Sequence, residues 1–386
     1  MTRRLVAILA VTVVGLWLSW AHDQSARVIA PPPAAPPIAA DPGTALLAPP
    51  GGSGGDGYGT SLAYAPDGRT LAVTRMEVVD QAGGKFASAA LISLRDMPGG
   101  GERAVIREEG AFAAECPAAF GPDGRILAVV LGRAIKLYDV ATGATAARLD
   151  FPGALESSSL AFAPDGRTLA ATNELGQLIT WDVATRRQAP PVQLSTRSAE
   201  GVAVSPDGRT IAVAATGPAV CRPVFGLFGL LPTGVACGTG PSRVRLFDRA
   251  ALAPRGELVH GSRLRSVAFA PDGKSLASGG GTATLWDLGT HAGQIVVARH
   301  NDVDVRCVAF APDGRTLAVG LRRADAGRTT RGEVDLCDVP GGTPRVALRG
   351  DLRSVDALAF APDGRSLVAA DSGRVVRWEL PPAAVH

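Results

Sequence analysis

Lysine is almost absent from this sequence, and its acidic and basic residues nearly balance. Only three lysines occur among 386 residues, and the formal net charge is +3. Without residues 1–40 the chain keeps 36 basic and 35 acidic residues, a net charge of +1. Nucleic-acid binding depends mainly on clustered lysine and arginine contacts to phosphates. We therefore expect no nucleic-acid partner.

The residue types of common catalytic and metal sites are also scarce. There are only five histidines, and no His-Glu-x-x-His motif occurs. The spacing of Cys116, Cys307 and Cys337 matches no zinc pattern, and we expect Cys307 and Cys337 to be buried as small apolar side chains. The sequence thus predicts a protein without a cofactor and without catalytic activity.

Long apolar runs are missing except at the N-terminus, where Arg3 and Arg4 precede the run Leu5–Ala21. A basic start followed by such a run is typical of a signal peptide or a membrane anchor, and both alternatives remain open for residues 1–21. Either one leaves the rest of the chain on the outer side of the membrane. Residues 22–42 form a proline-rich linker, and residues 381–386 a C-terminal tail. We expect an exported protein, either anchored and facing outward or released into the periplasm or medium.

Long helical patterns are also missing, whereas one short motif recurs throughout the chain. A Pro-Asp-Gly triplet follows one apolar run and precedes another, as in Leu160–Ala170. Proline suits the second position of a type I turn, aspartate the third and glycine the fourth, so each copy predicts a β-hairpin. Because neither run alternates between apolar and polar residues, both faces of each sheet should be covered. The seven triplets occupy residues 66–68, 122–124, 164–166, 206–208, 271–273, 312–314 and 362–364.

The spacing of these turns predicts the architecture. The shortest intervals are 41 and 42 residues, and each unit carries a later strand that ends on an acid, as in Trp181-Asp182. A period of about 40–45 residues with four strands per unit indicates propeller blades. The chain resembles a WD40-repeat protein of the bacterial exported or membrane-anchored type over residues 43–380. The resemblance implies an all-β fold with seven blades of four antiparallel strands, lettered a to d from the axis outwards.

The last blade lacks an outer strand at the C-terminal end of the sequence. Residues 44–48 precede the first inner strand, and we expect them to close the ring by pairing with Val375–Trp378. The family joins a His, a Ser or Thr, a Trp and an Asp within a blade. In the fifth unit His260, Ser278 and Trp286 match this structural network, although glycines replace the stretch that usually holds the Asp.

Three insertions interrupt the repeat, at residues 75–88, 217–241 and 321–332. All three fall between strands b and c, and strand order places such connections on one face of the ring, opposite the Pro-Asp-Gly turns. Enlarged loops that gather on one face suggest a binding surface. The second insertion has an apolar tip, and the third is rich in arginine. We predict that partner-binding residues lie among Val224, Phe225, Leu227, Phe228, Leu230, Leu231, Arg322, Arg323, Arg328 and Arg331.

Cys221 and Cys237 bracket the second insertion, and in an exported protein this arrangement predicts a disulfide. The alternative is that both are reduced cysteines that pack as small apolar residues. The apolar tip between them has three open interpretations: it contacts a partner, it touches the membrane surface, or it covers the mouth of the channel.

Three functions remain open. The first is a monomeric, non-catalytic interaction scaffold on the outer side of the cytoplasmic membrane, which binds a protein through the face with the insertions; the resemblance implies the same. The second is an enzyme or cation-binding propeller of lactonase or quinoprotein type, and the third a purely architectural part of an envelope assembly. The second needs acids that converge near the channel. The candidates are Glu156, Glu200, Asp302, Asp304 and Asp351.

Overall fold

The computed structural model consists of strands joined by short turns. It describes residues 43–47, 60–81, 85–110, 116–151, 159–194, 198–217, 219–225, 232–239, 241–297, 302–324 and 329–380. The N-terminal segment, the linker and the C-terminal tail lie outside these ranges. None of the described residues belongs to a helix that is long and apolar enough to cross a membrane.

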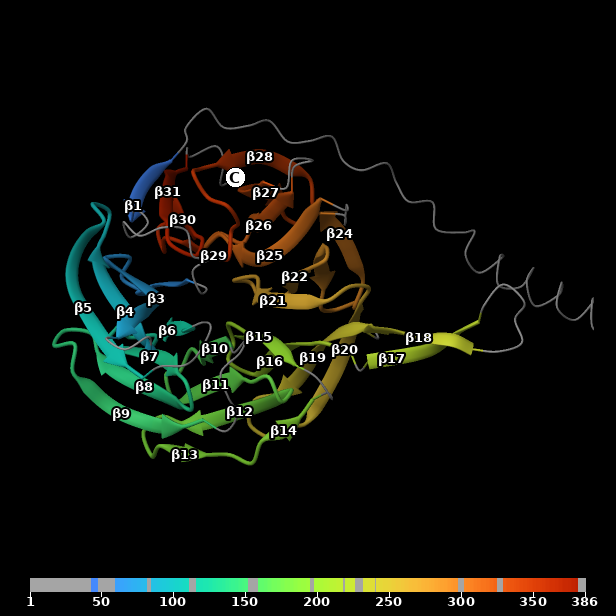
Figure 1. The fold of residues 1–386 in the computed structure, drawn as a ribbon, viewed down its shortest axis with the longest axis horizontal. Helices are drawn as coiled ribbons and strands as arrows, with labels where there is room; N and C mark the ends of the chain where they lie inside the picture. The colour runs from blue at the N-terminus through green and yellow to red at the C-terminus, as the bar shows by residue number, and fades with distance from the viewer. Residues whose placement is uncertain are drawn as a thin grey trace, which may run out of the picture. The chain divides into compact units, whose positions relative to one another are not determined.

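Seven antiparallel sheets are arranged as a ring of blades around a central axis (Figure 1), which confirms the predicted propeller. Each sheet runs from an inner strand a to an outer strand d. In blade 3 the outer strand is divided into two short pieces, both paired with strand c. The strands of blades 1 to 3 are β2 (Ser61–Tyr64), β3 (Thr70–Gln81), β4 (Lys85–Asp96) and β5 (Gly101–Glu109); β6 (Ala118–Phe120), β7 (Ile126–Leu131), β8 (Ala134–Asp139) and β9 (Thr145–Asp150); and β10 (Ser159–Phe162), β11 (Thr168–Thr172), β12 (Gln177–Asp182), β13 (Arg187–Gln188) and β14 (Val192–Gln193).

Blades 4 to 7 continue the ring with the same order of strands. Blade 4 is interrupted between strands b and c by a separate two-stranded sheet, β17 (Ala219–Phe225) and β18 (Pro232–Thr239), here called the ribbon. The strands of blades 4 to 7 are β15 (Ala199–Val204), β16 (Thr210–Ala215), β19 (Ser242–Asp248) and β20 (Pro254–His260); β21 (Leu264–Phe269), β22 (Ser275–Gly280), β23 (Ala283–Asp287) and β24 (Gly293–Val297); β25 (Val303–Phe310), β26 (Thr316–Ala324), β27 (Thr330–Asp338) and β28 (Pro344–Arg349); and β29 (Ala357–Phe360), β30 (Ser366–Ala370), β31 (Val375–Glu379) and β1 (Thr44–Leu47).

The Pro-Asp-Gly triplets form the predicted turns between strands a and b in all seven blades. In blade 3 the N–H of Gly166 donates to the carbonyl of Ala163 at 2.9 Å, and the glycine has a φ of 69°. The carboxylate of Asp165 accepts the backbone N–H of Arg167 at 3.0 Å. The same Asp-to-backbone bond occurs in the other six turns at 2.9 to 3.0 Å. The face of the ring that carries these turns is called the turn face below.

Neighbouring turns also pack against one another. A side chain added at Gly166 would place its Cβ 3.2 Å from Pro122, in the turn of the preceding blade. The same glycine-to-proline contact recurs around the ring, and Gly68 of blade 1 lies against Pro362 of blade 7. The turn motif therefore does more than reverse the chain, because its copies also join adjacent blades.

The ring closes as the sequence predicts. Strand β1 pairs antiparallel with β31, with Thr44 opposite Arg377 and Leu47 opposite Val375. Ala48, the last residue of the predicted closing strand, lies outside the described ranges. The guanidinium of Arg95, in blade 1, donates to the carbonyl of Leu46 at 2.9 Å and so links the closing strand to the next blade.

The core lies between adjacent blades. Strands b are buried on both faces, which the lack of alternation in the sequence predicted; Leu169, Ala170 and Ala171 of β11, for example, are all fully buried. Small alanines on this strand let the blades approach closely, while Trp181 and Ile135 fill the space between blades 2 and 3. Burial of this kind is the main favourable term in folding.

Candidate protein-binding face

The face opposite the turns carries the connections between strands b and c, and is called the insertion face below. The three insertions consist largely of paired strands where the sequence suggested loops. The β3–β4 ladder continues to the pair Gln81 and Lys85, and the β26–β27 ladder to Ala324 and Thr330. The ribbon forms a sheet of its own, and Figure 1 shows it extending away from the ring. Backbone hydrogen bonds thus shape the greater part of each insertion.

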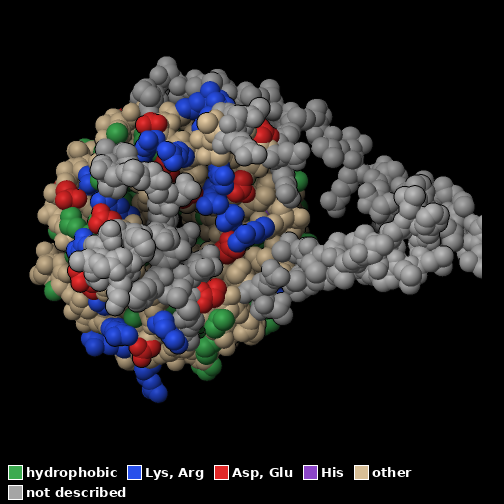
Figure 2. Space-filling model, viewed as in Figure 1, with side chains coloured by type: hydrophobic (Ala, Val, Ile, Leu, Met, Phe, Trp, Pro, Cys, Tyr) green, Lys and Arg blue, Asp and Glu red, His purple; other side chains and the backbone are tan. Residues whose placement is uncertain are grey.

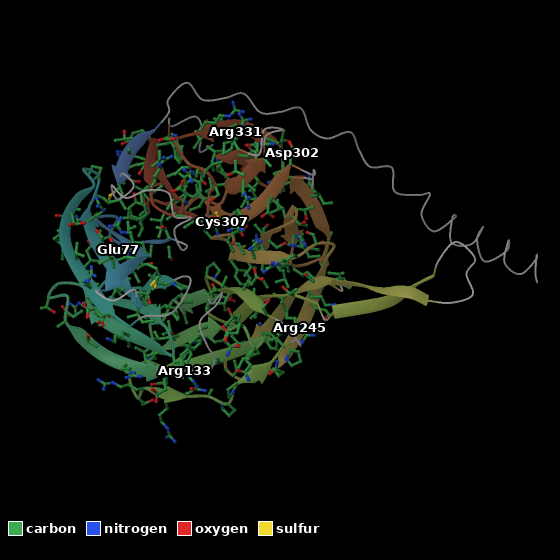
Figure 3. The ribbon with its side chains drawn as sticks, viewed as in Figure 1. Glu77, Arg133, Arg245, Asp302, Cys307 and Arg331 are labelled. Atoms are coloured by element: carbon green, nitrogen blue, oxygen red, sulfur yellow. The ribbon has the colours of Figure 1, made fainter. Side chains whose placement is uncertain are left out.

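A cavity of about 290 Å³ occupies the centre of the ring. The residues at the starts of the inner strands line it, and all seven blades contribute. Because strand a runs from the insertion face to the turn face, these first residues lie at the end of the channel that belongs to the insertion face. Figure 3 labels Cys307 near the centre of the ring, with Asp302 and Arg331 farther out.

The two sides of this channel mouth differ in charge. Blades 1 to 3 contribute neutral residues, including Ser61, Pro117 and Ser159, whereas blades 4 to 7 contribute Glu200, Arg265, Arg306 and Asp356. Figure 2 shows basic and acidic side chains close together around the centre of the face that it draws. Among the described lining residues, charge is therefore confined to blades 4 to 7.

Serines tie the neutral and charged blades into one ring. The hydroxyl of Ser61 accepts the backbone N–H of Ala118 in the next blade at 3.3 Å. Ser159 and Ser266 accept N–H groups of the following blades in the same way, at 3.1 and 3.3 Å. These side chains therefore stabilise the channel wall, which makes a structural role sufficient to explain them.

Two ion pairs at the mouth are hydrogen-bonded. Arg263 Nε lies 3.0 Å from Oε1 of Glu200, whose side chain is only 6% exposed. Arg306 Nε lies 3.1 Å from Oδ1 of Asp356, and Ser354 donates to the other oxygen of that carboxylate. Each pair joins neighbouring blades, so charge complementarity at the mouth also supports the ring.

Arg265 lies between these pairs with weaker contacts. Its guanidinium is 3.8 Å from Glu200 and 3.9 Å from Asp304, beyond hydrogen-bond distance. Burial and the nearby guanidinium groups of Arg306 and Arg263 lower the pKa of Arg265. Arg265 presents N–H donors to the channel, and its long ion contacts satisfy these donors only in part. The side chain is therefore suited to bind an incoming acceptor group.

The acids proposed for a cation site form no metal-binding cluster among the residues that the structure describes. Glu200 and Asp304 contact arginines, and Asp351 lies 2.8 Å from Arg374. Glu156 lies outside the described residues. Within the described ranges no group of three or more His, Cys, Asp or Glu side chains is placed to hold a metal ion.

Two of the predicted arginines contact acids of their own blade. Arg323 lies 3.3 Å and Arg331 4.0 Å from Glu333, which is only 3% exposed and also pairs with Arg349 at 3.0 Å. Asp335 follows on the same strand, 3.5 Å from Arg323. Burial raises the pKa of Asp335 to about 6, although Arg323 acts in the opposite direction. These arginines therefore neutralise buried carboxylates and are less available to a partner than the sequence suggested.

Of the other predicted contact residues, three are described by the structure and five are not. Arg322 is exposed on β26, where it lies in register with Asp304 of the inner strand. Val224 and Phe225 end strand β17, opposite Gly234 and Pro232. The rest lie outside the described residues: Leu227, Phe228, Leu230, Leu231 and Arg328.

The proposed structural network is formed in part. Trp286 Nε1 donates to Ser278 Oγ at 2.8 Å inside the blade. His260 is buried on the outer strand of blade 4 and contacts Thr282 Oγ1 at 3.2 Å and the carbonyl of Ser262 at 3.1 Å. Burial lowers the pKa of His260. The histidine of blade 4 thus contacts blade 5 at Thr282.

Four charged residues were not predicted from the sequence: Arg263, Arg265, Arg306 and Asp356. A signal was available for the last three, because they, like Glu200, occur directly before the small residue that opens each inner apolar run. This repeat position carries a charge in blades 4 to 7 and none in blade 1, where Thr60 stands.

Comparison with known families supports the architecture. Residues 254–287 and 294–326 match the sequence model described as WD domain, G-beta repeat. The chain contains WD40 repeats. The first match begins with the outer strand of blade 4 and runs through three strands of blade 5, so each WD40 unit spans two blades and links them covalently. No curated protein gives a significant match to the chain.

Proposed function

We propose that this WD40 propeller is a non-catalytic scaffold that binds a protein partner through its insertion face. Propellers with WD40 repeats commonly hold protein partners, and the repeats are present here. The proposal rests on one observation: the segments that depart from the repeat are concentrated on one face of the ring. Three extended b–c hairpins and a charged channel mouth lie there, whereas the turn face repeats one self-contained turn seven times.

The chemistry of the insertion face indicates the kind of partner. Arg265 offers N–H donors at the channel mouth, the exposed Arg322 offers further donors on β26, and the ribbon adds apolar residues such as Val224 and Phe225. Interfaces combine apolar anchors with polar groups that fix orientation. We infer a protein surface with an apolar anchor and acceptor groups, bound by a monomer of this chain.

We further propose that the propeller works on the outer side of the cytoplasmic membrane. This rests on the N-terminal sequence, in which Arg3 and Arg4 precede the apolar run Leu5–Ala21. The partner is then an envelope or extracellular protein. Protection of the propeller from protease in intact cells, and its loss when only the outer envelope is opened, would support this location.

The binding face can be tested by matched substitutions in the full chain. We expect Arg322→Glu, and separately a Gly/Ser replacement of residues 224–231, to lower recovery of co-purified partners at least about tenfold, a loss of about 1.4 kcal/mol in binding free energy. The controls are Arg125→Glu and Arg209→Glu, which make the same charge change at exposed positions of the turn face. Quantitative mass spectrometry of the co-purified proteins measures the effect.

Each variant is first checked for an unchanged circular dichroism spectrum and melting temperature. Equal loss of partner with the turn-face controls, or unchanged recovery with both insertion-face variants, would contradict the proposed face.

A further inference from the structure

The ribbon is the one two-stranded sheet of the described fold. Its two strands pair only with each other, without a third strand. An isolated two-stranded hairpin is at best marginally stable in water. Pro223 in β17 lacks an N–H group, and Gly234 in β18 lacks a side chain to pack, so both weaken the ladder further. An additional constraint on these strands is therefore needed.

The register of the ribbon supplies that constraint. Cys221 and Cys237 are direct partners in the antiparallel ladder, flanked by the pairs Val220 with Gly238 and Arg222 with Ala236. Direct partners in such a ladder have Cα atoms about 4.5 to 5.5 Å apart. Disulfides span Cα separations of about 4.4 to 6.8 Å. We propose that Cys221 and Cys237 form a cross-strand disulfide that holds the ribbon as a stable arm of the insertion face.

The other three cysteines lie in the blades and not in the ribbon. Cys116, Cys307 and Cys337 are all buried among the blades. Cys307 packs between blades 6 and 7, and Cys337 between blades 5 and 6, so these two lie on opposite faces of one sheet. Burial raises the pKa of both thiols, which disfavours the reactive thiolate. Neither of them is placed to compete for a partner in the ribbon.

The bond forms by exchange with an external disulfide. A thiolate of one ribbon cysteine attacks the external S–S bond, which forms a mixed disulfide and releases one thiol. The thiolate of the second cysteine then attacks the ribbon sulfur of that bond and releases the second thiol. Two cysteine thiols are oxidised and one external disulfide is reduced to two thiols. In the cell this step rests on the proposed export, because such oxidants persist outside the cytosol.

Peptide mapping tests the bond directly, without the partner. The purified full chain is equilibrated with oxidised glutathione, denatured, alkylated with or without prior reduction, and digested with trypsin. Trypsin does not cut between Arg222 and Pro223, so one peptide, residues 210–243, contains both ribbon cysteines and no other. We expect this peptide to be unlabelled before reduction and doubly labelled after it. The peptides with Cys116, Cys307 and Cys337 are internal controls and should be labelled in both cases.

A ribbon peptide that is alkylated twice without reductant, carries glutathione, or is linked to another cysteine would overturn the proposal. A second measurement tests the stabilising role. In the Cys221→Ser/Cys237→Ser variant we expect amide hydrogen exchange in β17 and β18 to accelerate roughly a hundredfold, the equivalent of losing closure of a loop of about seventeen residues. Exchange in the seven blades should not change, and equal exchange in the ribbon of both proteins would also overturn it.

These readouts are separate from those of the proposed function. A confirmed disulfide with unchanged partner recovery in both insertion-face variants would leave the bond in place and contradict the binding face. Absence of the bond, with partner recovery lost in those variants, would overturn the disulfide and leave the binding face supported.

Discussion

The turn face and the insertion face of this propeller are built on different principles. On the turn face each aspartate caps a backbone N–H and each glycine adopts positive φ, in seven nearly identical copies. On the insertion face the contacts differ from blade to blade, and Arg265 makes only long ion contacts. Beneath this face, the buried Oδ1 of Asp335 has no hydrogen-bond partner. The difference teaches that the repeated turn satisfies its own polar groups, while some residues that depart from the repeat keep polar groups that their neighbours satisfy only in part.

The largest effect on stability should follow from breaking the turn face. Gly166 has a φ of 69°, and a Cβ there would lie 3.2 Å from Pro122. We expect Gly166→Val to lower the free energy of unfolding by about 3 kcal/mol, because a branched side chain is strained at positive φ and pushes on the neighbouring turn. Urea unfolding monitored by tryptophan fluorescence measures the loss.

The matched control lies on the insertion face. Gly261 joins blades 4 and 5, and an added Cβ there would meet nothing within 4 Å. Gly261→Val should change the free energy of unfolding by less than about 0.5 kcal/mol. Equal losses for both variants would show that the two faces do not differ in how tightly they are built.

A smaller effect, with the opposite sign, is expected from Asp335 beneath the insertion face. This carboxyl is buried, and its folded-state pKa of about 6 lies above the value of about 3.9 for an unfolded aspartate. The folded state therefore binds more protons between these pH values, and this group lowers stability as the pH rises through that window. We expect Asp335→Asn to raise the free energy of unfolding by about 1 to 2 kcal/mol at pH 8, after allowing for the lost contact with Arg323.

The gain in the free energy of unfolding of Asp335→Asn should vanish at pH 4, because the wild-type carboxyl is then largely protonated in the folded state. Asp338→Asn is the control, because Asp338 is more exposed on the same strand. Unfolding curves at the two pH values decide the matter: an Asp335→Asn variant that is destabilised equally at both would contradict the raised pKa.

The sequence predicted the features that repeat, and structure was needed for those that do not. Seven triplets sufficed to place seven turns, and the missing outer strand after Trp378 sufficed to predict closure by residues 44–48, of which Thr44–Leu47 pair with β31. Glu200 and Arg263, by contrast, are 63 residues apart in neighbouring blades, and nothing in the repeat relates them. Local pattern reveals which strand a residue occupies, but the partner of a charged side chain depends on how neighbouring blades pack.

The insertions illustrate the same limit. Residues 321–332 were interpreted as a polar, basic loop because they contain four arginines, at positions 322, 323, 328 and 331. In the structure most of the segment is a two-stranded extension, and two of these arginines turn toward Glu333. Composition shows that the segment is basic. The buried Glu333 determines which way two of the segment's arginine side chains point.

The smallest of the predicted effects concerns the turn aspartates and reverses the pH dependence of Asp335. Oδ1 of Asp207 accepts hydrogen bonds from Ser205 Oγ at 2.5 Å and from the backbone N–H of Arg209 at 3.0 Å. These bonds, that of Ser205 first, lower the pKa of the carboxyl. Asp207→Ala should therefore cost about 1 kcal/mol at pH 7. Because the folded pKa lies below the unfolded one, the contribution of Asp207 is complete above about pH 4 and is lost as the pH falls through its folded value. The urea midpoints of the wild-type and Asp207→Ala proteins should then converge toward pH 3. The control is Asp302→Ala, which removes an exposed acid of the insertion face and should match the wild type at every pH.

A cost for Asp207→Ala that stays constant down to pH 3 would mean that packing of the turn, and not its capped carboxylate, distinguishes the two faces.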